Sequence, residues 1–127
     1  MKILLGHLGW SDEAVRWFRA LAERARGYGY EVEPICLVPD APAPRMRFDD
    51  LDRRWRRRDP ALVRLRDELI EAARGADVFW NLNGANVHPD WLPHLSTLNV
   101  YGCFDDPESS ANLSAPVARY FDAALVG

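Results

Sequence analysis

The side chains with the greatest capacity for chemistry form an acidic stretch near the end of the chain. Asp105, Asp106 and Glu108 supply three carboxylates, and Ser109 adds a hydroxyl. Carboxylates in such a cluster can accept a proton from a sugar hydroxyl or bind the hydroxyl groups of a polyol. Helix capping offers a second explanation, because Asp106 suits an N-cap and Pro107 the first helical position. Capping leaves Asp105 unexplained, so Asp105 is the stronger catalytic candidate.

A second candidate site lies at the other end of the chain, in the turn Gly6-His7-Leu8-Gly9-Trp10. The imidazole of His7 titrates near neutral pH and can act as a general base, with Gly6, Gly9 and Trp10 as substrate-binding neighbours. The alternatives are a surface or capping histidine and glycines that only make a tight turn. The turn lacks the Lys-Ser/Thr ending of a P-loop and the third glycine of a dinucleotide fingerprint.

Two asparagines form the third candidate group. Asn83 and Asn86 follow an apolar run, and their amides can both donate and accept hydrogen bonds to a substrate. Asparagine also favours turns, because it tolerates left-handed backbone conformations. We therefore predict substrate binding by Asn83 and Asn86, with turn formation as the alternative explanation.

The elements that would position these side chains follow from hydrophobic periodicity. Short apolar runs predict strands, and apolar residues at helical spacing predict helices. Ser11 is the expected cap of the first helix, and Gly27 and Gly29 are its expected end. The predicted strands are 3–5, 31–38, 77–82, 97–101 and 123–126; the predicted helices are the one after Ser11, 60–74 and 116–121, with a single helical turn at 89–93. Residues 39–59 interrupt the pattern, and we interpret them as an inserted loop.

Alternation of strands and helices predicts the α/β class, a Rossmann-like three-layer sandwich with a mostly parallel sheet of about five strands. In open sheets of this kind, ligands bind beyond the carboxyl ends of the strands. The loops at 6–11, 81–88 and 102–110 all follow predicted strands. The three candidate groups are therefore expected at one edge of the sheet.

Composition narrows the possible functions. A chain of 127 residues is the size of one domain, and its net charge of −3 gives the whole surface no attraction for nucleic acid. No apolar run is long enough to span a membrane. The spacing of Cys36 and Cys103 indicates reduced thiols and a cytoplasmic location, and we expect no metal and no cofactor.

The arginine-rich run 53–58 contains Trp55. We interpret it as a phosphate-binding or base-stacking segment, or as a solvated face whose positive charge is partly neutralised by nearby aspartates.

Residues 99–107, Asn-Val-Tyr-Gly-Cys-Phe-Asp-Asp-Pro, and 120–126, Tyr-Phe-Asp-Ala-Ala-Leu-Val, carry a family resemblance. With the glycine-rich turn after the first strand, they resemble the N-terminal half of GT-B glycosyltransferases, in particular bacterial enzymes of the spore-maturation-protein type. The resemblance implies a two-domain enzyme that moves a sugar from a nucleotide-sugar donor to an acceptor hydroxyl.

By the same resemblance, this chain would hold the acceptor, a small molecule or glycan, and a C-terminal domain would hold the donor. Acceptor-cleft roles then fall to Gly6, His7, Gly9, Asp105 and Asp106, and whether His7 or an aspartate is the base stays open. The chain stops directly after its last predicted strand. We therefore expect it to be the N-terminal part of a larger enzyme and inactive by itself.

The alternative function is a non-catalytic, flavodoxin-like domain that binds a ligand, or a protein-interaction domain with 39–59 as its contact surface. A signalling receiver domain is disfavoured by its residue requirements. It needs acidic residues after the first strand, a phospho-acceptor aspartate after the third and a lysine after the fifth. This chain has Gly6-His7, Asn81 to Asn83 and Val126-Gly127 at those places.

Overall fold

The computed structural model describes residues 1–9, 11–39, 46–82, 86–103, 111, 112 and 114–126. Its centre is a five-stranded parallel sheet of order β2-β1-β3-β4-β5. The strands are β1 (Lys2–His7), β2 (Glu31–Cys36), β3 (Val78–Leu82), β4 (Leu98–Cys103) and β5 (Ala123–Val126). The predicted α/β class and Rossmann-like sheet are confirmed.

The register of the strands brings their carboxyl ends to one edge of the sheet. His7 at the end of β1 lies opposite Cys36 of β2, and Gly6 lies opposite Asn81 of β3. Asn81 in turn lies opposite Tyr101 of β4. The last residues of β1, β3 and β4 therefore lie at the same edge of the sheet.

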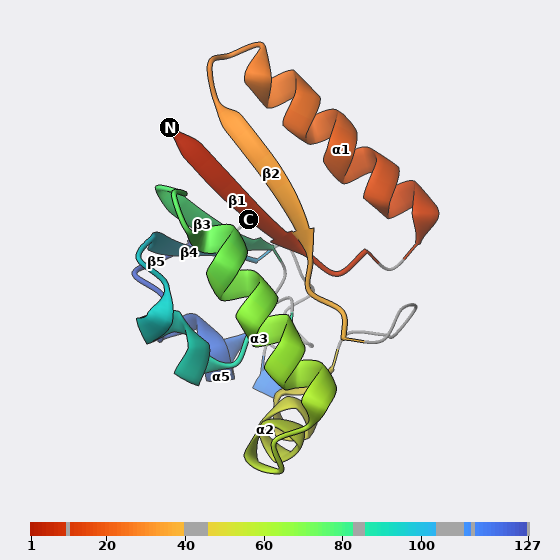
Figure 1. The fold of residues 1–127 in the computed structure, drawn as a ribbon, viewed down its shortest axis with the longest axis vertical. Helices are drawn as coiled ribbons and strands as arrows, with labels where there is room; N and C mark the ends of the chain where they lie inside the picture. Colours follow the sequence, from red (N-terminus) through yellow and green to blue (C-terminus); the bar gives the residue numbers. More distant parts are fainter. Residues whose placement is uncertain (10, 40–45, 83–85, 104–110, 113, 127) are drawn as a thin grey trace.

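Helix α1 (Asp12–Arg26) covers one face of the sheet over β1 and β2 (Figure 1). The Ser11 hydroxyl accepts a hydrogen bond from the Ala14 amide at 3.1 Å, which confirms the predicted cap. The buried side of the helix includes Phe18, which packs in one cluster with Leu5 and Val32 of the sheet. Residues at helical spacing thus form the apolar side that the periodicity predicts.

The opposite face carries the larger core. It is covered by α3 (Pro60–Ala73), the 3₁₀ helix η1 (Pro89–His94) and the short helix α5 (Ala115–Ala118), and α2 (Phe48–Arg56) packs at the beginning of α3 (Figure 1). Side chains from these elements and from the sheet form one buried cluster that includes Leu4, Leu51, Leu69, Phe79 and Trp91. Helices on both faces of a parallel sheet give the three layers that the sequence predicts.

The prediction of an inserted loop at 39–59 is wrong for its second half, because residues 48–56 form α2. The charges of this segment stabilise the helix instead of marking a coil. Arg56 pairs with Asp52 one turn earlier at 2.9 Å, and Arg53 pairs with Asp50. Leu51 is buried in the main core. A helix with so few apolar residues gives a weak periodic signal in the sequence.

Helix α2 docks on η1 through His88, which is buried between aromatic rings. The Nδ1 atom of His88 accepts a hydrogen bond from the Asp90 amide at 3.1 Å, so Nε2 carries the proton and donates to Asp52 Oδ1 at 3.1 Å. The rings of Phe48 and Trp91 lie 6.0 and 6.5 Å from the His88 ring. Hydrogen bonds from Arg56 and then from His88 hold the pKa of Asp52 below its ordinary value.

Asn86 connects the two ends of the segment that precedes α2. Its Nδ2 donates to the Leu37 carbonyl at 3.0 Å, and its Oδ1 accepts from the Met46 amide at 2.9 Å. The side chain is 1% exposed. Asn86, predicted to bind substrate, therefore has a structural role in joining main-chain groups that are far apart in sequence.

Replacing Asn86 by alanine is expected to lower the free energy of unfolding by about 2–4 kcal/mol, because the Leu37 carbonyl and the Met46 amide would lose their partner. Urea titration followed by circular dichroism measures the change. Asn112→Ala, at an exposed helical position, serves as the matched control and should stay within about 0.5 kcal/mol of wild type. Equal stabilities for both variants would remove the structural role.

Candidate functional site

A small crevice lies at the carboxyl edge of the sheet, between β1, β2 and the first two turns of α1. It has a volume of about 210 Å³ and is lined by His7, Val15, Arg19, Pro34 and Cys36. The wall contains one imidazole, one guanidinium and one thiol. Because ligands of open α/β sheets bind at this edge, the crevice is the candidate functional site.

His7 is neither a surface nor a capping residue. Its side chain is 4% exposed, and its ring stacks on Phe18 with centroids 4.3 Å apart. The Nδ1 atom is buried and has no hydrogen-bond partner among the residues described. Buried polar atoms are normally paired, so this unpartnered nitrogen in a residue that lines the crevice marks His7 as a candidate for ligand binding.

Burial also sets the charge state of this imidazole. It lowers the pKa of His7 below the ordinary value of 6.5, because the protonated form would lose its hydration. In the described part of the chain, no carboxylate forms an ion pair with the ring to oppose this effect. His7 is therefore neutral at physiological pH, which is the state that a general base requires.

The two polar residues that line the crevice beside His7, Arg19 and Cys36, were not predicted as site residues from the sequence. Arg19 was not among the candidates, and Cys36 was interpreted as an ordinary reduced thiol. The pairing of His7 with Cys36 in the parallel register brings the thiol to the site, and Arg19 reaches the same crevice from the second turn of α1. The pairing of β1 with β2 is what places Cys36 beside His7, and the positions of these residues in the sequence do not reveal that pairing.

The glycines of the first loop have packing explanations. A Cβ atom at Gly6 would lie 2.7 Å from Leu37 Cδ1 and 2.9 Å from Phe79 Cε2, on the face opposite His7. Gly9 has a φ of +53°. A Cβ atom at Gly9 would lie 3.0 Å from Cys36 Sγ. The tight-turn explanation fits Gly9, which has a positive φ, whereas Gly6 lies inside β1 and is explained by close packing. The contact of either glycine with a substrate stays a prediction.

The remaining predicted site residues lie outside the described part of the chain. These are Trp10, Asn83, Asp105, Asp106, Glu108 and Ser109. In the sequence, Asn83 comes directly after the last residue of β3, and Asp105 comes two residues after the last residue of β4. The structure thus brings together His7, Gly6 and Gly9 of the predicted set and directs Asn86 into the core.

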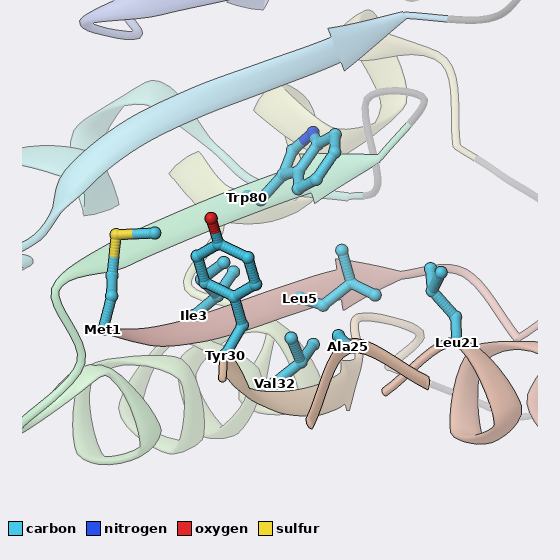
Figure 2. Close-up of a pocket in the computed structure, with 8 residues that line it drawn as sticks. All are labelled: Met1, Ile3, Leu5, Leu21, Ala25, Tyr30, Val32 and Trp80. Atoms are coloured by element: carbon cyan, nitrogen blue, oxygen red, sulfur yellow. The ribbon is translucent and has the colours of Figure 1, made fainter. Parts of the chain in front are cut away.

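A separate apolar hollow of about 340 Å³ lies on the α1 face of the sheet (Figure 2). Its lining is formed by Met1, Ile3, Leu5, Leu21, Ala25, Tyr30, Val32 and Trp80. Figure 2 shows Trp80 rising from its strand beside the Tyr30 ring. Met1 and Tyr30 directly precede β1 and β2, and Ile3 lies near the beginning of β1, so this hollow is remote from the carboxyl edge. Its lining contains no imidazole, carboxylate or thiol.

Other classes of site receive no support from the described residues. No three His, Cys, Asp or Glu side chains among them are grouped to hold a metal ion. None of the described helices combines the length and apolarity needed to cross a bilayer. In comparisons with known proteins, no family model, curated protein or solved structure matches the chain. The geometry of the crevice is therefore the evidence from which a function must be argued.

Gly6→Ala is expected to destabilise the protein by about 1–3 kcal/mol, because its Cβ would overlap Leu37 and Phe79 in a filled core. Thermal unfolding followed by circular dichroism measures the loss. Gly27→Ala is the control, since Gly27 has a helical φ of −62° and should change stability little. A Gly6 variant as stable as wild type would contradict the packing explanation.

The titration of His7 predicts a pH dependence of stability. With its pKa lowered in the folded state, His7 binds protons more readily when the chain is unfolded. The contribution of neutral His7 to the free energy of unfolding is therefore fully present above about pH 6.5. It is lost as the pH falls through the pKa of His7 in the folded state. The free energy of unfolding of wild type should decrease over this range more steeply than that of His7→Phe, which keeps the stacking on Phe18. Parallel curves would contradict a lowered pKa.

Proposed function

We propose that this chain is the acceptor-side domain of a GT-B-type glycosyltransferase and that His7 is its general base. The observation that carries the proposal is the buried, neutral imidazole at the carboxyl edge of β1, with a nitrogen unpartnered among the described residues. Two further observations support it. The fold is a Rossmann-like parallel sheet, and residues 99–107 and 120–126 resemble that family.

The proposed reaction needs only one proton transfer from this domain. An acceptor hydroxyl in the crevice hydrogen-bonds to His7, and its oxygen attacks the anomeric carbon of the donor sugar. The bond between that carbon and the nucleotide diphosphate breaks, and the diphosphate leaves with the electron pair. The hydroxyl proton passes to the imidazole, which is neutral beforehand and can accept it. In this proposal the donor is held by a nucleotide-binding domain that faces the crevice.

Arg19 and Cys36 have simpler roles in this scheme. The exposed guanidinium of Arg19 can donate hydrogen bonds to acceptor oxygen atoms, while Val15 and Pro34 contact the carbon skeleton. The Cys36 thiol donates weakly to the Leu8 carbonyl, with 3.7 Å between Sγ and the oxygen, which orients it along the turn. Asp105, the other candidate base, enters the test because the sequence places it after the end of β4.

Turnover measurements on His7→Gln and Asp105→Asn test the assignment of the base. They require a protein in which this chain is joined to a nucleotide-binding domain, and they follow transfer of labelled sugar from a panel of nucleotide sugars. Loss of the base should lower kcat by about 100-fold or more with little change in thermal stability. A large loss for His7→Gln alone identifies the imidazole, and a large loss for Asp105→Asn alone identifies the carboxylate.

His94→Gln is the matched control, because it makes the same replacement at an exposed histidine and should keep kcat within about twofold. Wild-type turnover in both the His7 and the Asp105 variants would remove both residues from the catalytic list. If no nucleotide sugar supports transfer but glycans still bind the chain, the non-catalytic ligand-binding alternative is favoured.

A further inference from the structure

The junction between α2 and α3 contains an arginine in a backbone conformation that favours glycine. The Asp59 amide donates to the Arg54 carbonyl at 3.1 Å, and the Arg58 amide donates to the Trp55 carbonyl at 2.8 Å. This pair of hydrogen bonds defines a Schellman motif, which places Arg58 in the left-handed region at φ +54°. Among the residues described, Arg58 is the one non-glycine with a positive φ.

The same Schellman motif ends α1, and there the left-handed position is occupied by glycine, as is usual for this motif. There the Tyr30 amide donates to the Ala25 carbonyl and the Gly29 amide to the Arg26 carbonyl, and the left-handed position is occupied by Gly29 at φ +85°. An arginine in that position costs stability, because its Cβ crowds the backbone. The left-handed turn ends α2, and a glycine would form it without strain, so the arginine side chain is the feature that the local fold leaves unexplained.

The Arg58 side chain lines a hollow of about 390 Å³ between the last turn of α2, the first turn of α3 and η1. The other lining residues are Trp55, Arg56, Val63 and Asp90. This hollow is distinct from the crevice at His7, with which it shares no lining residue. Its volume is enough for one sugar-sized ring and its substituents.

Arg58 has no ion-pair partner among the residues that the structure describes, although the Asp90 carboxylate lines the same hollow. Neighbouring arginines are engaged, since Arg54 pairs with Asp59 at 2.6 Å and Arg56 pairs with Asp52 at 2.9 Å. The nearby Asp90 carboxylate accepts the Trp55 indole N–H at 3.0 Å and lies 3.6 Å from His88 Nδ1. The Arg58 guanidinium therefore remains available at the hollow for an external anion.

Trp55 forms a fixed, partly exposed wall beside that guanidinium. The hydrogen bond to Asp90 orients the indole, and Trp91 packs edge-on against it with 5.4 Å between ring centroids. The guanidinium of Arg66 lies over the ring at 5.4 Å. The hollow thus combines a free cation with a rigid aromatic and aliphatic surface supplied by Trp55 and Val63.

We propose that this hollow binds a phosphate ester carried on a ring, such as a sugar phosphate. Arg58 pairs with the phosphate, because a guanidinium matches two phosphate oxygens with parallel hydrogen bonds. The ring packs against Trp55 and Val63. Asp90 weakens the site by repulsion, while its hydrogen bond keeps the indole in place. This inference goes beyond the transfer reaction, and binding at the hollow can be measured whether or not His7 is a base.

Titration of the Trp55 indole N–H resonance at low ionic strength tests the site, with Trp55→Phe identifying the signal. The probes are glucose 6-phosphate, inorganic phosphate and glucose, which supply the anion and ring together, the anion alone and the ring alone. We expect glucose 6-phosphate to bind most tightly, phosphate more weakly and glucose weakest. Equal affinities for the two phosphates would contradict the ring contact, and no shift with either would overturn the site.

Arg58→Gly separates function from folding. It removes the guanidinium and relieves the backbone, so Tm should rise by about 2–4 °C while the affinity for glucose 6-phosphate falls at least about fivefold. Arg57→Ala makes the same change of charge one residue away, outside the hollow, and should keep the affinity within about twofold. If both variants lose affinity equally, a general electrostatic field explains binding and the site is overturned.

Asp90→Asn supplies a test that predicts a gain. The amide oxygen of asparagine can still accept the Trp55 N–H, but the negative charge beside the phosphate is removed. Affinity for glucose 6-phosphate should increase by about twofold or more, and the increase should shrink as salt is added. An unchanged or weaker affinity in this variant would contradict a phosphate seated between Arg58 and Trp55.

Discussion

Strand β1 is hydrogen-bonded on both sides, to β2 and to β3, and both of its faces are buried. Its side chains therefore alternate between two cores. Leu4, and Leu8 directly after the strand, belong to the core beneath α3, whereas Leu5 and His7 face α1. A shift of the register by one residue would exchange the two sets and carry the imidazole to the other core. The position of the candidate site thus depends on the same alternation that fills the protein interior.

Much of the fold follows from local sequence signals. The cap at Ser11, the helix from Pro60 and the strands were predictable because apolar spacing and terminal residues agree with one another. Helix α2 was not, because its charges pair along the helix and Leu51 is its one buried residue among those described. In that segment, stability comes from contacts to His88 and Trp91, which lie more than thirty positions later in the sequence.

The candidate site was only partly predictable for a similar reason. Residue types identified His7 as chemically capable, but its burial against Phe18 is a property of packing. The sequence likewise suggested a ligand-binding role for Asn86, but it did not reveal that the Asn86 amide joins two distant main-chain groups. A side-chain amide that can hydrogen-bond to a ligand can equally hydrogen-bond to the main chain of the protein. Which of these partners it meets depends on the three-dimensional path of the chain.

The two cysteines differ in exposure, so a label can be attached selectively at the crevice. Cys36 is exposed and lies beside His7, whereas Cys103 is buried with its Sγ 3.5 Å from the Ser114 hydroxyl. In the native protein a thiol reagent therefore has one accessible target. A small fluorophore attached at Cys36 would stand at the mouth of the crevice, where its emission would register the arrival of a molecule without any change to the imidazole.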